Sequence, residues 1–102
     1  MSAPPLPIRV SPRAAAQIEA AAAWWQEHRP FAPGAIHDDI ARVLALLSAQ
    51  PGVGTPARGV KVPGARRLIL SRVRYYIYYR VSEGVLEILA FWHMSRSQEP
   101  RL

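Results

Sequence analysis

The sequence predicts an α+β fold in which an N-terminal helical hairpin packs on a small antiparallel β-sheet. Three observations favour it: an Ala-rich segment behind a helix start signal, a second segment with apolar residues at helical spacing, and three β-type segments that follow. The expected order of elements is β-α-α-β-β-β. The chain has 102 residues, of which 50% are hydrophobic and 20% charged, so we expect one globular domain over residues 1–102.

A short strand and a long helix are expected first. Residues 6–10 alternate between apolar and other residues, and Pro7 cannot donate to a strand ladder, which favours a place at the edge of the sheet. Ser11 is a good N-cap, a proline follows it, and seven Ala lie within residues 14–23. We expect this helix over residues 12–28, with a core-facing stripe of Ala15, Ile18, Ala22 and Trp25.

A second helix is expected from Pro33 or Gly34 to Ala49, antiparallel to the first. Asp38 and Asp39 lie near its start and are expected in solvent, where the helix dipole favours acidic residues. Residues 51–65 hold four Gly and three Pro, which predicts a loop of a length often linked to function. The apolar stripe of the helix consists of Ile36, Ile40, Val43, Leu44 and Leu47.

Three strands are expected at residues 66–70, 75–81 and 85–93, which are rich in Leu, Ile, Val and Tyr. A two-residue turn at Glu83-Gly84 sets the register of the last two strands, because Gly readily adopts a positive φ. That register separates the two faces of the hairpin most cleanly. It places on the helix side Tyr75, Ile77, Tyr79, Val81, Leu86, Ile88, Ala90 and Trp92.

The same register predicts the opposite face of the sheet. It pairs Tyr78 with Leu89, Tyr76 with Phe91, Arg80 with Glu87, and Arg74 with His93. A turn at Arg72-Val73 would set Leu70 opposite Tyr75 and Leu68 opposite Ile77. Basic and aromatic side chains would then share this face, which suits stacking and phosphate contact. Two alternatives remain: the tyrosines simply pack on a pleated surface, or a C-terminal tail or partner chain covers them.

The charge distribution indicates an anionic partner. The net charge is +6, and residues 51–102 carry all of it, with eight Arg and one Lys against three acidic residues. Residues 1–50 hold four Arg and four acidic residues. Nucleic acid, an acidic protein segment or a membrane surface would each suit a basic half.

Several classes of protein are excluded by composition. The chain has no Cys, so thiol chemistry and Cys-ligated zinc are absent, and its three His are too scattered to predict a metal site. No apolar run approaches the roughly 18–20 residues that cross a bilayer. The N-terminus lacks a signal-peptide pattern, so we expect a cytoplasmic protein with neither cofactor nor metal.

The layout and four of its segments resemble a known superfamily. The segments are Pro-Gly-Val-Gly after the second helix, Gly-Ala-Arg-Arg-Leu-Ile-Leu, Tyr-Tyr-Ile-Tyr-Tyr-Arg-Val, and Val-Leu-Glu-Ile-Leu-Ala-Phe-Trp-His-Met-Ser-Arg. Over nearly the whole chain the sequence resembles the RelE/ParE superfamily of toxins from bacterial type II toxin–antitoxin modules. The resemblance implies growth inhibition, plasmid stabilisation and a cognate antitoxin whose acidic, amphipathic tail wraps the toxin.

The superfamily has two branches, and the residues favour one of them. RelE-like toxins cut mRNA in the ribosome, whereas ParE-like toxins poison DNA gyrase without nuclease chemistry. Cleavage at a ribose 2′-OH needs a base, a cation and an acid. By motif position Arg67 (or Arg66) would be the cation and His93 the acid or base. Residues 55–61, where RelE-like enzymes place a Glu or Lys base, hold only Lys61, so we expect a gyrase-directed toxin rather than an enzyme.

Further residues are candidates for binding. Trp24 and Trp25 point about 100° apart on a helix. We expect one to pack beneath the hairpin and the other either to contact the antitoxin or to cover the loop around Phe31. We expect the target, gyrase, to be contacted by Arg66, Arg74, Tyr76, Tyr78, Arg80 and Arg96. In two alternatives the same residues would contact nucleic acid: RNA if the protein is a ribonuclease, and RNA or DNA if it is a plain nucleic-acid-binding module.

Overall fold

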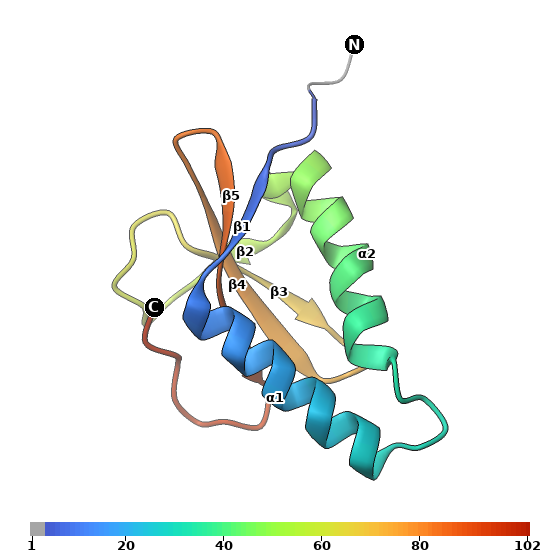
Figure 1. Cartoon of the computed structure of the whole chain (residues 1–102). Coiled ribbons are helices and arrows are strands. Elements are labelled where there is room, and N and C mark those ends of the chain that lie inside the picture. The colour runs from blue at the N-terminus through green and yellow to red at the C-terminus, as the bar shows by residue number, and fades with distance from the viewer. Residues whose placement is uncertain (1–3) are drawn as a thin grey trace.

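The computed structural model describes residues 4–102, and its elements follow the expected order (Figure 1). Two helices precede the main strands, and the loop between α2 and β3 contains two short elements that the sequence did not predict. The elements are β1 (Ile8–Val10), α1 (Pro12–His28), α2 (Ala35–Ala49), the 3₁₀ turn η1 (Pro51–Val53), β2 (Thr55–Pro56), β3 (Arg66–Leu70), β4 (Tyr75–Ser82) and β5 (Val85–His93).

The five strands form one sheet in the order β1-β5-β4-β3-β2. The edge position expected for the first strand is confirmed, and the N–H of Leu86 donates to the carbonyl of Pro7 at 2.9 Å. The sheet is mixed rather than wholly antiparallel, because β1 runs parallel to β5 with Ile8 opposite Leu86. A parallel neighbour requires a crossover, and the chain between β1 and β5 provides it.

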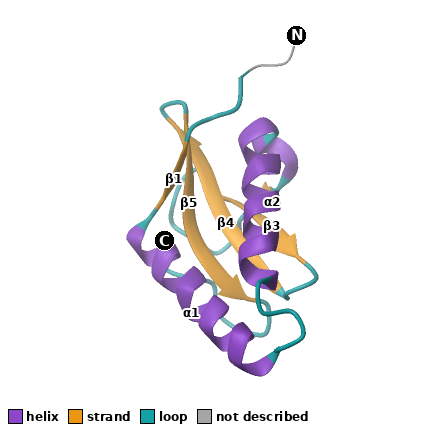
Figure 2. Ribbon diagram, turned by 45° about the vertical axis from the view of Figure 1, so that its right-hand side comes forward, coloured by secondary structure: helices purple, strands orange, loops and turns teal. Residues whose placement is uncertain are grey.

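Both helices lie on one face of the sheet, as predicted (Figure 2). The Oγ of Ser11 caps α1 by accepting from the N–H of Ala14 at 3.0 Å. Three residues of the predicted α1 stripe, Ile18, Ala22 and Trp25, lie at the core, but Ala15 is exposed and Ala14 is buried in its place. The expected stripe of α2 is confirmed, with Ile36, Ile40 and Leu47 buried and Val43 and Leu44 packed against the core.

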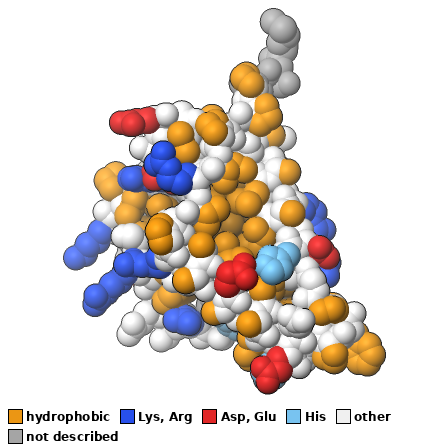
Figure 3. Space-filling model, in the orientation of Figure 1, with side chains coloured by type: hydrophobic (Ala, Val, Ile, Leu, Met, Phe, Trp, Pro, Cys, Tyr) orange, Lys and Arg blue, Asp and Glu red, His pale blue; other side chains and the backbone are white. Residues whose placement is uncertain are grey.

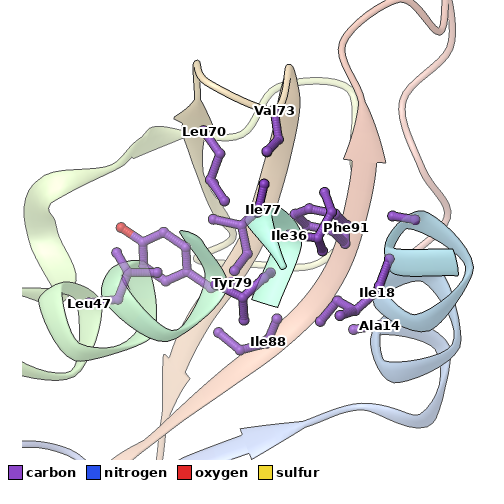
Figure 4. Packing of buried hydrophobic residues seen from close by; sticks show 14 of the residues in the cluster. Ala14, Ile18, Ile36, Leu47, Leu70, Val73, Ile77, Tyr79, Ile88 and Phe91 are labelled. Atoms are coloured by element: carbon purple, nitrogen blue, oxygen red, sulfur yellow. The ribbon is translucent and has the colours of Figure 1, made fainter. Parts of the chain in front are cut away.

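The core lies between the helices and the sheet (Figure 4). Ile18 of α1 and Ile36 of α2 point toward the strands, which contribute Ile77, Ile88 and Phe91 to the same cluster. Among the residues described, neither helix is long and apolar enough to cross a membrane.

The β4–β5 hairpin departs from the predicted register halfway along. Pairing runs as expected from Ser82 opposite Val85 to Tyr79 opposite Ile88, but Tyr78 then pairs with Ala90, which leaves Leu89 as a bulge. A bulge of one residue reverses the facing of every later side chain on its strand. Five predicted pairs are therefore wrong: Tyr78–Leu89, Ile77–Ala90, Tyr76–Phe91, Tyr75–Trp92 and Arg74–His93.

Contacts with α1 explain the bulge. The N–H of Ser11 donates to the carbonyl of Ile88 at 3.0 Å, and the N–H of Phe91 donates to Oε1 of Gln17 at 2.8 Å. These bonds satisfy backbone groups at the edge of β5, beyond the point where its pairing with β1 ends. The bulge brings Phe91 into the core, a larger apolar side chain than the predicted Ala90.

The β3–β4 pairing matches the prediction, with Leu70 opposite Tyr75 and Leu68 opposite Ile77. The turn is longer than two residues and closes through a bond of 2.9 Å from the N–H of Arg74 to the carbonyl of Leu70. Arg74 therefore lies in the turn with a φ of 66°, and not in a strand opposite His93.

Three residues of the hairpin that were expected on the helix side lie outside the core. The bulge turns Ala90 and Trp92 to the other face of the sheet, and Val81 is 45% exposed near the tip of the β4–β5 hairpin.

The side chain of Tyr79 holds the loop that follows α2 in place through two hydrogen bonds. Its hydroxyl donates to the carbonyl of Pro51 at 2.7 Å and accepts from the N–H of Gly54 at 2.9 Å. A Cβ at Gly54 would overlap this hydroxyl and lie 2.9 Å from the carbonyl oxygen of Arg67. The close approach explains why glycine occupies this position.

Candidate functional site

The predicted site residues divide between the two faces of the sheet. On the face away from the helices, here called the outer face, the guanidinium of Arg67 lies 4.1 Å from the ring centre of Tyr76. Tyr76 pairs across the strands with Trp92, and the guanidinium of Arg96 lies 4.1 Å from the ring centre of Trp92. Two arginine side chains thus make cation–π contacts with two neighbouring aromatic rings.

The chain after β5 folds back beside this row. The indole N–H of Trp92 donates to the carbonyl of Gln98 at 2.7 Å, and the side chain of Arg13 donates to the carbonyl of Arg101. Pro100 is buried. The tail therefore lies against part of the sheet, as one of the sequence-based alternatives anticipated.

Tyr78 does not belong to the accessible surface. Its side chain is only 1% exposed, although it was expected to be available for target contact. Arg67 opposes it on β3 and Ala90, which is also buried, opposes it on β5. Tyr78 is therefore a packing residue of the outer face.

Two further arginines already have partners within the chain. Arg66 donates to the carbonyl of Gly54 at 2.6 Å, and Nε of Arg80 donates to Oε1 of Glu87 at 3.0 Å, as the expected cross-strand pair. Arg74 and Arg96 are exposed. Among the predicted contact residues, the exposed positive charges therefore lie at the β3–β4 turn, with Arg74, and just beyond β5, with Arg96.

A pocket of ≈ 320 Å³ opens on the helix side of the sheet. Both tryptophans of α1 line it, and we call it the indole pocket. Trp24 is 45% exposed, and its ring stacks on His28 with 4.4 Å between ring centres. Trp25 packs against the core and also lies edge-on to Trp24. The lining residues are Trp24, Trp25, Val73, Tyr75, His93, Ser95 and Arg96.

The bulge determines where His93 lies. His93 pairs with Tyr75, whose ring also stacks on the core residue Phe91, so His93 shares the helix side. Arg67 stacks on Tyr76, whose side chain points to the other side of the same strand. Arg67 and His93 therefore lie on opposite faces of the sheet. Arg66, the alternative cation, opposes Tyr79, which lies four residues along β4 from Tyr75, the partner of His93, so Arg66 and His93 are also separated, by about 13 Å along the strand.

Sequence reasoning missed part of the indole pocket. Val73 and Ser95 follow from no motif, and Tyr75 was expected only as a core residue. No local sequence signal reveals the pocket, because the bulge at Leu89 is what brings His93 to the same side as the tryptophans. Among residues 4–102, no cluster of three His, Cys, Asp or Glu side chains could hold a metal ion.

The charged side chains are unevenly spread over the surface (Figure 3). On the face drawn, most Lys and Arg side chains lie on the side of the loop before β3 and of the C-terminus. Apolar side chains dominate the middle of this face. The asymmetry in the sequence thus becomes an asymmetry of the folded surface.

Comparison with solved structures identifies the fold. A chain of the structure described as "Chromosomal ParDE TA system from P. aeruginosa" matches with a TM-score of 0.75 at 24% sequence identity, over 91% of this chain and 100% of that chain. The match confirms the predicted α+β fold. No curated protein is significantly similar in sequence.

The family comparison gives the class of protein. The family model described as "ParE toxin of type II toxin-antitoxin system, parDE" matches residues 8–98. The protein is therefore a toxin of a type II toxin–antitoxin system, and such a system implies a cognate antitoxin. Within that class, the chain belongs to the ParE toxin family, which confirms the resemblance seen in the sequence.

Proposed function

We propose that this ParE-family toxin inhibits DNA gyrase and is neutralised by a cognate antitoxin with an acidic, amphipathic tail. The observation that carries the proposal is the separation of Arg67 from His93 by the sheet. A ribonuclease would need its cation and its acid or base at one scissile phosphate. In this role the protein acts in the cytoplasm and contributes to plasmid stabilisation.

The target surface in this proposal centres on the accessible cations. Arg74 and Arg96 are exposed, and Arg67 and Arg96 are held in place by the rings beneath them. Tyr76, which is partly exposed, adds an aromatic surface. Arg66 and Arg80 are secondary contacts, because each already bonds within the chain.

The antitoxin surface in this proposal includes Trp24 and Trp25. Trp24 is nearly half exposed, and large aromatic residues contribute most to protein interfaces. The guanidinium of Arg29 lies 5.4 Å from the ring centre of Trp24, which places positive charge beside the aromatic surface. An acidic amphipathic segment matches both features.

A supercoiling assay with purified gyrase and the full chain tests the target. We expect the toxin to inhibit supercoiling and to trap gyrase on DNA, and the double substitution Arg74→Gln/Arg96→Gln to weaken inhibition at least tenfold. Arg58→Gln is the matched control, because Arg58 is exposed in the loop before β3 and is not among the proposed contacts.

The ribonuclease alternative gives a different result in cells. Codon-phased cuts in mRNA after expression without antitoxin, abolished by Arg67→Ala/His93→Ala, would establish that alternative and overturn gyrase as the target. Inhibited supercoiling with intact mRNA supports the proposal. Tight, salt-dependent binding to bare DNA or RNA without either effect would instead indicate a nucleic-acid-binding module.

A further inference from the structure

We propose that the indole pocket is a binding site for a carboxylate carried on an aromatic or apolar body. The pocket lies between the C-terminal half of α1 and the end of β5, on the side of the sheet opposite Arg67. Its volume of ≈ 320 Å³ is at the lower end of the range for small-ligand sites.

The first observation is a buried donor without an acceptor. The indole N–H of Trp25 is shielded from solvent and has no hydrogen-bond partner among the described residues. An unsatisfied buried donor costs free energy, and most such groups in folded proteins are bonded. Trp25 lines the pocket, so a small rotation of its ring toward the cavity would let an oxygen of a bound ligand accept from this N–H.

The second observation concerns His93. The backbone N–H of Ser95 donates to Nδ1 of His93 at 3.0 Å, and the hydroxyl of Ser95 lies 2.6 Å from the same nitrogen. Because Nδ1 accepts a hydrogen bond, the neutral ring carries its proton on Nε2. His93 thus provides a second donor in the lining of the pocket.

The third observation is the sign of the charge. Arg96 lines the pocket at the end of β5, where its charge acts on the phenol of Tyr75 as well as on the ring of Trp92. It has no ion-pair partner among the described residues. Arg29 lies within 5.8 Å of the ring centre of Trp25. No acidic residue of the described chain lines the pocket. Donors and cations without acidic residues select an anion.

The walls determine what carries the anion. Trp24 and Trp25 meet edge-on at 61°, and Tyr75 and His93 meet edge-on at 84°. These rings give the pocket aromatic walls against which an aromatic or apolar group can pack. An arylacetate combines a carboxylate with an aromatic group, and an acidic side chain next to an apolar one offers the same combination.

Two sources can supply this chemistry. One is an acidic side chain from the antitoxin, a source that rests on the proposed function. The other is a free arylacetate. Both would present the same carboxylate to Trp25, His93 and Arg96, and the experiment separates them.

Amide and indole NMR of the full, ¹⁵N-labelled chain tests the proposal with phenylacetate as the probe and phenylacetamide as its uncharged match. We expect phenylacetate to move the indole N–H signal of Trp25, and phenylacetamide to bind at least tenfold more weakly. Trp25→Phe and Arg96→Gln should each weaken phenylacetate binding about tenfold or more, as expected for a lost bond to a charged group. Arg58→Gln is the control, since Arg58 is exposed and does not line the pocket.

The outcomes are distinct. An unmoved Trp25 signal, or equal binding of acid and amide, overturns the site, whatever the result with gyrase. A complex with the antitoxin that moves the same signal and excludes phenylacetate identifies the antitoxin as the source. Phenylacetate binding that persists in the complex identifies a free acid. In either of the last two cases the carboxylate site stands.

Discussion

At the scale of single residues, Tyr79 shows how one buried hydroxyl organises a loop. It bridges the carbonyl of Pro51 and the N–H of Gly54, two groups that no helix or strand satisfies. Burial raises the pKa of the Tyr79 phenol, while the bond from Gly54 and the charge of Arg66 act in the opposite direction. The neutral hydroxyl is therefore the form that the fold requires.

Tyr79→Phe should destabilise the protein by about 1–3 kcal/mol at neutral pH, because two backbone groups lose their partner. The wild-type hydroxyl contributes fully below the unfolded-state pKa of about 10, and its contribution is lost as the pH rises through the raised folded-state pKa. Urea unfolding at neutral and alkaline pH should show the difference between wild type and variant shrinking at high pH. A difference independent of pH would contradict this role.

Gly54→Ala should destabilise the protein by about 1–3 kcal/mol, since the new methyl group overlaps the Tyr79 hydroxyl and crowds the Arg67 carbonyl. Thermal unfolding measures the loss. Gly52→Ala is the matched control, because a Cβ there meets no atom within 4 Å. Equal effects of the two substitutions would show that the close approach at Gly54 has no energetic consequence.

At the scale of elements, the bulge in β5 decides what each face of the sheet presents. Phe91 enters the core through it, and Trp92 turns to the outer face beside Tyr76. An unbroken ladder would give the reverse assignment. The composition of both candidate surfaces therefore depends on one extra residue, Leu89.

Phe91→Ala should cost about 3–5 kcal/mol in the free energy of unfolding, the usual loss for a buried aromatic residue. Trp92→Ala should cost less, because Trp92 is only partly buried. Chemical denaturation of the two variants provides the comparison. A larger loss at Trp92 would restore the unbroken register.

Helix and strand bounds could be predicted because their signals are local. The N-cap at Ser11 and the Gly84 turn act within a few residues, and α1, β3 and β5 have the expected bounds. The bulge could not be predicted, since it depends on Gln17 of α1 reaching Phe91. The indole pocket was hidden for the same reason.

Asp39 is a second case of a distant contact. It was expected in solvent, but it is only 3% exposed and pairs with Arg42 on its own helix and with Arg72 at 3.5 Å. The spacing within α2 suggests only the first of these pairs. Burial of the carboxylate depends on the β3–β4 turn, which no local pattern brings to α2.

At the scale of the whole molecule, the net charge differs between the two halves of the chain, which form different parts of the fold. Residues 51–102 carry the +6 and form β2 to β5, their loops and the tail, whereas residues 1–50, with β1 and both helices, have no net charge. A field of this kind accelerates encounter with an acidic partner more than it tightens the final complex.

Association with an acidic antitoxin should therefore slow as ionic strength rises, while dissociation changes less. Stopped-flow mixing of toxin and antitoxin at roughly 0.05 and 0.5 M salt, across the range where screening becomes strong, measures both rates. An association rate that does not change with salt would contradict electrostatic steering.

The parallel pairing of β1 with β5 has a consequence for synthesis. The first strand can join the sheet only after β5 has been made, because Ile8 pairs with Leu86. Helix α1 also depends on β5, through the hydrogen bond between Gln17 and Phe91. Contacts between such distant positions form slowly and cannot form on a partly made chain. During synthesis, the strand β1 and the helix α1 therefore stay without their partner in the sheet until β5 has been translated.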